Sequence, residues 1–305
     1  MIRRIIEISG GPARLSIEHG QLVIDRPEKP RATTPCEDVG VLLVDHPAVT
    51  YTHGVFTTLL DNGAAVVLCG YDHQPAGLFL PVSGNTVQSE RYRNQIDAAL
   101  PLKKRLWQGI VITKVKQQAA ILRTTSGADE GLGALASRVR SGDPENLEAQ
   151  AAQRYWPHLL GPDFRRDRAG APPNNLLNYG YMALRAAIAR ALCSAGLLPT
   201  LGIHHRNRYN AFCLADDVME PYRPFIDLKV HGLVRDGFAS PEIGRDEKRV
   251  LLGAFNDLVE IGGQRTPLLL ALHATASSLN EAFASREPRL EFPTGLPAEP
   301  NHDDG

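Results

Sequence analysis

The chain has 305 residues, 43% of them hydrophobic and 22% charged, and its formal net charge is −1. These values are typical of a soluble globular protein with room for two domains, and they argue against a polycationic partner of packaged nucleic acid. Four widely spaced cysteines argue against a structural zinc site. Without an apolar signal segment or a run near the ~20 residues of a membrane span, we expect a cytoplasmic protein with no membrane contact.

The first eighty residues carry β-strand patterns. Short alternating apolar runs occupy residues 6–24, and the break at 18–21 is typical of a hairpin turn. VGVLLVD (39–45) and AAVVLCG (64–70) are rich in β-branched residues and predict strands buried on both faces. The stretch between them has helical spacing and a glycine stop, which predicts a short helix. We therefore expect a β-rich, sandwich-like domain over residues 1–80.

Beyond a linker-like segment at 81–86, apolar residues recur with the helical period of 3.6. Helices are predicted at about 87–98, 102–123, 144–160, 175–195, 212–220, 245–261 and 266–285. A polar, Arg-rich connection over 161–175 is long for a structural loop, which favours mobility or contact with a substrate. Prolines, glycines and acidic residues over 286–305 predict a disordered tail. The expected class is α+β, with an all-α domain over 87–285 following the β-rich one.

The stretch LGIHHRNRYNAFCLADDVMEPYRP (201–224) concentrates groups able to bind a metal or a proton: His204, His205, Asp216, Asp217 and Glu220. On a helix over 212–220 the acids repel one another. Either arginines neutralise them in a surface salt-bridge cluster, or a cation lies among them. Leu214 and Val218 mark the buried side, so we expect the acids near the surface and Asp216 exposed. Adjacent histidines diverge, so at most one of the two is a ligand.

Two further features have alternative interpretations. Glu148 heads an otherwise apolar helical stripe, where a buried carboxylate would need a cation. In the first helical turn it could equally serve the helix dipole. A segment without acids carries six basic residues, which either contact DNA phosphates or cover apolar surface with their stems. The six are Lys103, Lys104, Arg105, Lys114, Lys116 and Arg123.

Residues 174–224 closely resemble the core of Cas1, the CRISPR-associated integrase family. The resemblance lies in LNYGY at 177–181, GLLPTLGIHH at 196–205 and DVMEPYRP at 217–224. Glu148-Ala149 looks like the upstream glutamate motif of the family, and the β-then-helical layout matches over all of the chain except the tail. The HHRNRYN sequence is most similar to type II members, which are found beside Cas9 effectors.

The resemblance implies one divalent cation, Mg²⁺ or Mn²⁺, held by Glu148, His205 and Glu220. His205 is preferred to His204 because its fifteen-residue spacing to Glu220 fits type II members better. Asp217 is then a supporting residue rather than a ligand. Two carboxylates and an imidazole, with positions left open for water and phosphate oxygens, suit these ions better than zinc.

The resemblance also implies a metal-dependent endonuclease and integrase that joins the 3′-hydroxyl ends of a DNA fragment into a CRISPR repeat by transesterification. It implies a homodimer, two of which flank a Cas2 dimer, with other type II adaptation proteins as further partners. The DNA contacts expected are Lys103, Lys104, Arg105, Lys114, Lys116, Arg206 and Arg208. Two alternatives remain open at this point: a catalytically silent DNA-binding scaffold, and a general metal-dependent nuclease acting on branched DNA.

Overall fold

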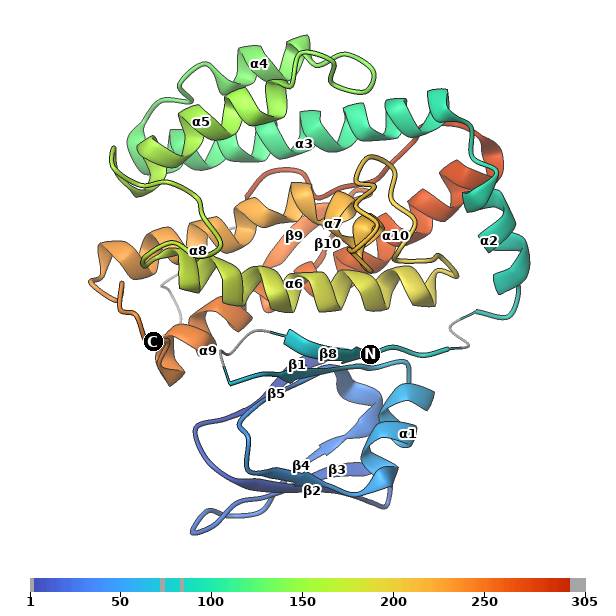
Figure 1. Ribbon diagram of the computed structural model, residues 1–305, viewed down its shortest axis with the longest axis vertical. Helices are drawn as coiled ribbons and strands as arrows, with labels where there is room; N and C mark the ends of the chain where they lie inside the picture. The colour runs from blue at the N-terminus through green and yellow to red at the C-terminus, as the bar shows by residue number, and fades with distance from the viewer. Residues whose placement is uncertain (1–2, 72–74, 83–84, 297–305) are drawn as a thin grey trace.

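The computed structural model describes residues 3–71, 75–82 and 85–296, with strands in the N-terminal part and helices in most of the remainder (Figure 1). This arrangement confirms the α+β fold class. The N-terminal elements are β1 (Arg4–Ser9), β2 (Ala13–Glu18), β3 (Gln21–Asp25), β4 (Ala32–Pro35), the 3-10 helix η1 (Cys36–Asp38), β5 (Val39–Asp45), β6 (Val49–Tyr51), α1 (His53–Asp61), β7 (Ala65–Cys69) and β8 (Pro75–Phe79). The predicted strands, hairpin and short helix of this region are all present.

The N-terminal strands form two four-stranded sheets, ordered β1-β5-β7-β8 and β4-β3-β2-β6. In the first sheet, alternate residues of β5 enter two different cores. Leu42 and Val44 pack towards the second sheet, while Val41 and Leu43 pack into the larger core that the helices build. Side chains alternate between faces along a strand, so a strand covered on both sides needs the continuous apolar run that the sequence shows.

The remaining elements are α2 (Gln88–Ile96), α3 (Leu100–Ser126), α4 (Leu132–Arg138), α5 (Leu147–Leu160), α6 (Asn174–Ser194), α7 (Cys213–Met219), η2 (Glu220–Tyr222), α8 (Arg223–Arg235), α9 (Arg245–Gly253), η3 (Ala254–Asn256), β9 (Leu258–Ile261), β10 (Gln264–Pro267) and α10 (Leu268–Ser285). Helix α6 contacts β5 and β7 on one side and α7, α8 and α10 on others. Figure 1 shows it between the first sheet and the layer that contains α3. Surrounded in this way, α6 is apolar around most of its circumference.

Several elements depart from the sequence predictions. Helices α4 and α8 were not predicted, and the single helix expected over 245–261 ends at Gly253 and gives way to β9. The β9–β10 hairpin, which turns at Gly262-Gly263, is an exception to the expected all-α composition of 87–285. Two glycines with positive φ suit a tight hairpin turn. Pro224 stands in the first turn of α8, where proline begins a helix rather than ending one.

The ordered chain continues past the predicted start of the tail. Phe292 packs against the helical core, Gln117 donates a hydrogen bond to the Pro293 carbonyl at 2.7 Å, and the Thr294 amide donates to Glu260 at 2.8 Å. The disorder expected from residue 286 is therefore wrong for 286–296, while 297–305 lies outside the described residues. Within the described part of the chain, no helix combines the length and hydropathy needed to cross a bilayer.

Gly180 permits close packing of α6 on α8. A Cβ atom at this position would lie 2.4 Å from Cγ2 of Ile226. We expect Gly180→Ala to lower the free energy of unfolding by about 1–3 kcal/mol through overpacking, seen as a reduced urea midpoint. Gly232→Ala in α8 is the control, because a Cβ there meets no atom within 4 Å. Equal midpoints for the two variants would contradict the packing argument.

Candidate metal site

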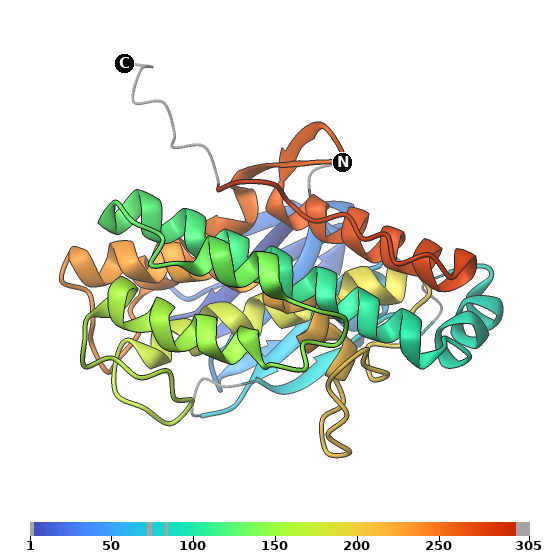
Figure 2. The same ribbon diagram turned by 90° about the horizontal axis from the view of Figure 1, so that it is seen from above.

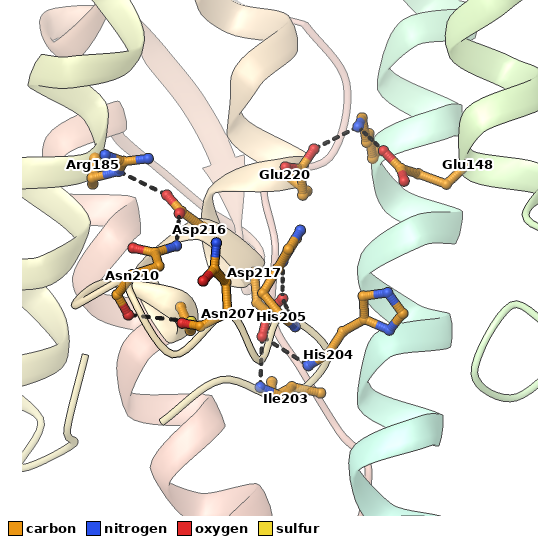
Figure 3. Close-up of polar contacts among 12 residues, drawn as sticks. Glu148, Arg185, Ile203, His204, His205, Asn207, Asn210, Asp216, Asp217 and Glu220 are labelled. Atoms are coloured by element: carbon orange, nitrogen blue, oxygen red, sulfur yellow. Dashed lines mark hydrogen bonds and ion pairs between the residues drawn. The ribbon is translucent and has the colours of Figure 1, made fainter. Parts of the chain in front are cut away.

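Two of the predicted ligands face the same point from different helices. Glu148 lies in the first turn of α5, where the Asp143 carboxylate accepts the amides of Leu147 at 2.9 Å and Glu148 at 3.0 Å. Glu220 opens η2, and α3 runs past both residues (Figure 3). The Lys114 ammonium on α3 contacts Glu148 Oε1 and lies 2.5 Å from Glu220 Oε2. Because one nitrogen touches both carboxylates, their oxygens already surround a position for a cation.

The Glu220 carboxylate and the Lys114 ammonium each stabilise the charged form of the other. Arg223 Nε donates to the second oxygen of Glu220 at 2.9 Å. Burial acts to raise the pKa of Glu220, but Arg223 and Lys114 outweigh it, so the pKa falls below its usual value. For Lys114, burial acts to lower the pKa, and the two glutamates reverse the direction. The carboxylate of Glu220 therefore stays ionised, ready to bind a cation.

Asp217 organises the loop that carries the two histidines. Its carboxylate is fully buried and accepts the backbone amides of Ile203 at 2.5 Å, His204 at 2.9 Å and His205 at 3.1 Å. Three amides on one carboxylate hold the loop around it. Asp217 thus has a supporting position rather than a place beside the two glutamates.

The expectation that Asp216 is exposed is wrong. Its carboxylate is buried, with Arg185 Nε at 2.7 Å and the Asn210 side-chain amide donating at 2.7 Å. A surface salt-bridge cluster would use the neighbouring Arg206, Arg208 and Arg223. Of these three, only Arg223 pairs with one of the acids within the described ion pairs. The acids of α7 are buried because partners on other elements neutralise them, which the helix pattern alone does not reveal.

The His205 ring is held by Asp217. Its Nδ1 lies 2.6 Å from Asp217 Oδ1, and because an ionised carboxylate only accepts, Nδ1 carries the proton. The other nitrogen, Nε2, is then the one that can bind a cation, as in histidines oriented by a carboxylate in metal sites. The hydrogen bond to Asp217 raises the pKa of His205 against the opposing effect of burial.

His204 has a different environment. Its ring stacks flat on Trp107 of α3, with centroids 4.1 Å apart and planes within 6°. The His205 ring is edge-on to it, with centroids 5.6 Å apart, and also contacts Trp107, so the two rings lie side by side rather than diverging as expected (Figure 3). Burial lowers the pKa of His204, which keeps the ring neutral against the indole.

The three predicted ligands do not converge on one point. Among residues 3–71, 75–82 and 85–296, no group of three His, Cys, Asp or Glu side chains is close enough to hold an ion. Two contacts keep the three side chains apart. The Lys114 ammonium lies between the two glutamates, and the His205 ring is hydrogen-bonded to Asp217. The donor set itself, two carboxylates and an imidazole, fits a hard divalent cation that keeps several waters.

A cavity of about 600 Å³ adjoins these residues. Its lining combines aromatic side chains with basic ones, namely Trp156, Phe164, Tyr181, Arg165, Arg166 and Arg223. Lys114, Glu148 and Glu220 also line it. A recess with arginines beside a cation position suits a phosphate-bearing substrate.

Asp227 also lines this cavity, although it was not predicted as a site residue. The hydroxyls of Tyr155, at 3.1 Å, and Tyr181 both donate to its carboxylate. Burial raises the pKa of Asp227 to about 7, although both tyrosines act to lower it. Asp227 lies in α8, beyond the helix predicted over 212–220, so no predicted element linked it to Glu220.

The connection between α5 and α6 forms the rim of the cavity. Arg166 donates to Asn174 at 3.0 Å and to Asn178 at 2.8 Å, and its guanidinium lies 5.4 Å from the centroid of the Tyr181 ring. Phe164 and Arg165 of the same connection line the cavity. This placement supports the substrate-facing interpretation of the loop.

The basic segment on α3 divides into two faces. Lys103 and Lys114 are eleven residues apart and share a face, while Arg105 and Lys116 share another about 200° around the helix. Lys114 is buried between the glutamates, so its assignment as a surface contact for DNA is wrong. Trp107, four residues after Lys103 on α3, stacks on His204, so this face lies beside the histidine loop. Burial and the nearby Arg206 lower the pKa of Lys103.

Arg206 and Arg208 are exposed on the connection between α6 and α7. Figure 2 shows this connection standing out from the body of the molecule. Tyr209 is 80% exposed at the same place, and Arg208 lies over its ring, 4.7 Å from the centroid. A protruding basic and aromatic loop beside His205 is able to contact DNA.

Comparison with known proteins gives consistent matches. The family model of CRISPR associated protein Cas1 matches residues 7–253. The chain is 36% identical to the CRISPR-associated endonuclease Cas1 of Neisseria meningitidis serogroup C (strain 8013), over 97% of each chain. Two solved structures share the fold at lower identity. A casposase bound to its integration product has a TM-score of 0.76 and 18% identity, covering 95% of this chain and 92% of that one. A Cas6-RT-Cas1–Cas2 complex has a TM-score of 0.72 and 19% identity, and the match covers 94% of this chain and 35% of that one.

Proposed function

This chain belongs to the Cas1 family of CRISPR-associated proteins, and we propose that it inserts DNA fragments into CRISPR arrays by strand transfer that depends on a divalent metal. One observation carries the metal-dependent part: Glu148 and Glu220 already bind a single cationic group between them. His205 adds a ring whose Nε2 is left to bind by the Asp217 hydrogen bond. We assign the metal ligands as Glu148, His205 and Glu220, with His204 outside the set.

The chemistry follows from this donor set. Mg²⁺ or Mn²⁺ held there would polarise the reacting phosphate and neutralise the charge that develops on its oxygens. Arg223 and Arg166 line the adjoining cavity, where their guanidinium groups can hold neighbouring phosphate oxygens. The 3′-oxygen of the incoming fragment forms the new ester bond to phosphorus, and the repeat strand leaves with its own 3′-hydroxyl. The attacking group comes from DNA, so no side-chain nucleophile is needed; water in its place gives hydrolysis.

Substrate and partners are proposed from the relatives. The Neisseria relative is named an endonuclease, the casposase was seen with an integration product, and another neighbour contains Cas1 with Cas2. We propose that this chain acts on double-stranded DNA, both spacer fragment and repeat, in the cytoplasm. We further propose that it works as a homodimer, two copies of which flank a Cas2 dimer, together with other type II adaptation proteins.

The function is tested by strand transfer with purified protein, Cas2 and Mn²⁺ or Mg²⁺. A short duplex with 3′-hydroxyl ends should be joined covalently to a repeat-bearing plasmid. The same duplex ending in 3′-deoxy nucleotides should not be joined, and chelation of the metal should stop the reaction. Binding without joining would indicate a silent scaffold, and cleavage of branched DNA without joining would indicate a general nuclease; either result contradicts the proposal.

Lys103, on the face of α3 beside the histidine loop, and its neighbour Lys104, about 100° around the helix, are expected to contact DNA. Lys103→Glu with Lys104→Glu should weaken DNA binding and make log Kd less dependent on log salt, by about 0.9 for each phosphate that the protein no longer neutralises. The matched comparison is Arg105→Glu with Lys116→Glu, the same change of charge on the opposite face. An unchanged slope in the first double variant would remove Lys103 and Lys104 from the DNA path.

A further inference from the structure

Lys114 occupies the point where the assigned ligands would bind their metal. The side chain is 9% exposed, and its ammonium contacts both Glu148 and Glu220. We propose that Lys114 is a resident cation that holds the two carboxylates together before metal binds and then moves into the adjoining cavity, towards Gln118. This inference rests on the proposed function, in that it assumes Glu148 and Glu220 to be metal ligands.

Lys114 and a divalent ion cannot share this position. An oxygen-bound Mg²⁺ or Mn²⁺ needs carboxylate oxygens at about 2.0–2.6 Å, and the oxygens concerned are already in contact with the ammonium. The two cations would also repel strongly at so short a distance in a buried site. Binding of the metal therefore requires the lysine to leave, and part of the binding free energy is used to move it.

The cavity offers a defined place for the displaced group. Gln118 lies one helical turn after Lys114 on α3 and lines the same cavity. Gln118 is 2% exposed, and its Oε1 has no hydrogen-bond partner among the residues that the structure describes, which is rare for a buried oxygen. Asp227, also buried, is a second acceptor in that lining. A lysine stem with four rotatable methylenes can carry its ammonium from the glutamates to these oxygens.

This movement gives Lys114, as a positioning residue, a different effect before, during and after metal binding. Before metal binding it prevents repulsion between Glu148 and Glu220, and so keeps the site folded. During metal binding it competes for the carboxylates and weakens the affinity. Once displaced, its charge lies in the cavity lined by Arg166 and Arg223, where it adds to the attraction for phosphate.

Lys114→Met tests the competition, because methionine keeps similar length and removes the charge. Calorimetric titration of the metal-free protein with Mn²⁺ should give a Kd at least about tenfold lower than wild type. The Tm without metal should fall, and the rise in Tm on adding Mn²⁺ should be larger. Lys229→Met is the matched control, since it removes an ion pair with Asp257 away from the site; its Mn²⁺ affinity should equal that of wild type. A Lys114→Met protein that binds Mn²⁺ no more tightly than wild type overturns the proposal.

Gln118→Leu tests the destination and covers the case in which Lys114→Met does not fold. The Tm without metal should not fall, because Gln118 Oε1 makes no hydrogen bond there, whereas Mn²⁺ affinity should weaken about tenfold. Unchanged Mn²⁺ affinity in Gln118→Leu overturns this destination. In the Lys114→Met background the effect of Gln118→Leu should vanish. Wild-type protein that binds no Mn²⁺ refutes the proposed function itself, while wild-type binding with a persistent Gln118 effect refutes only the movement of Lys114.

Discussion

His205→Ala is expected to reduce strand transfer by more than about a hundredfold, and Glu220→Ala should do the same. Each variant removes a proposed ligand, and metal sites already lose about 10–100-fold when only a supporting residue is changed. In His205→Ala the buried Asp217 also loses the ring that it orients. The measurement is the initial rate of joining at saturating Mn²⁺, with DNA binding measured in parallel to show that the complex still forms.

His204→Ala separates the two adjacent histidines. Its ring stacks on Trp107 and bonds to neither glutamate, so the variant loses about 0.5–1.5 kcal/mol of ring contact. We expect a reduction of about tenfold or less in the same assay. A dead His204→Ala beside an active His205→Ala would transfer the ligand role to His204. Equal activity in all three variants would remove the metal site from this part of the molecule.

Asp217→Asn is expected to lower Mn²⁺ affinity by about 10–100-fold and the free energy of unfolding by at least about 1–3 kcal/mol. One carboxylate oxygen accepts the amides of Ile203 and His204, and the other accepts the amide of His205 and its ring N–H. An asparagine can offer an oxygen to only one of these pairs, and its NH₂ group would oppose donors at the other. The histidine loop would lose hydrogen bonds that hold it in place, and the His205 ring would lose its fixed orientation.

Asp216→Asn is the matched control for this change. Asp216 is buried on the same helix and is bound by Arg185 and Asn210, but it does not contact the histidine loop amides. We expect lower stability with unchanged Mn²⁺ affinity, measured by urea unfolding and calorimetry. An equal loss of affinity in both variants would show that general destabilisation, rather than ring orientation, explains the effect of Asp217.

The strands and most helices could be predicted because their signals are local. The run at 39–45 becomes β5 over the same residues, and the 18–21 turn joins β2 to β3. Helix α8 was not predicted, although Pro224 stands in its first turn, where proline is favoured. Local sequence patterns therefore predicted most of the elements. Proline was ambiguous, because it is found both where a helix ends and in the first turn of a new one.

The site was less accessible to residue patterns. Spacing alone left Glu148 and the 201–224 acids open to a surface interpretation, and the ligand set came from the family resemblance. Lys114 joins Glu148 and Glu220 across 34 and 106 residues of chain, and no local pattern reports such contacts. One sequence feature did indicate that Lys114 is buried. It lies seven residues after Trp107 and seven before Ile121, on a helical stripe whose residues are all buried.

Anomalous diffraction from crystals grown with Mn²⁺ tests the metal site most directly. We expect one strong peak at about 2.0–2.6 Å from a carboxylate oxygen of Glu148, a carboxylate oxygen of Glu220 and Nε2 of His205, with the Lys114 ammonium turned away from both glutamates. A peak bound by His204, or the absence of any peak while Lys114 keeps both of its contacts, would contradict the assignment.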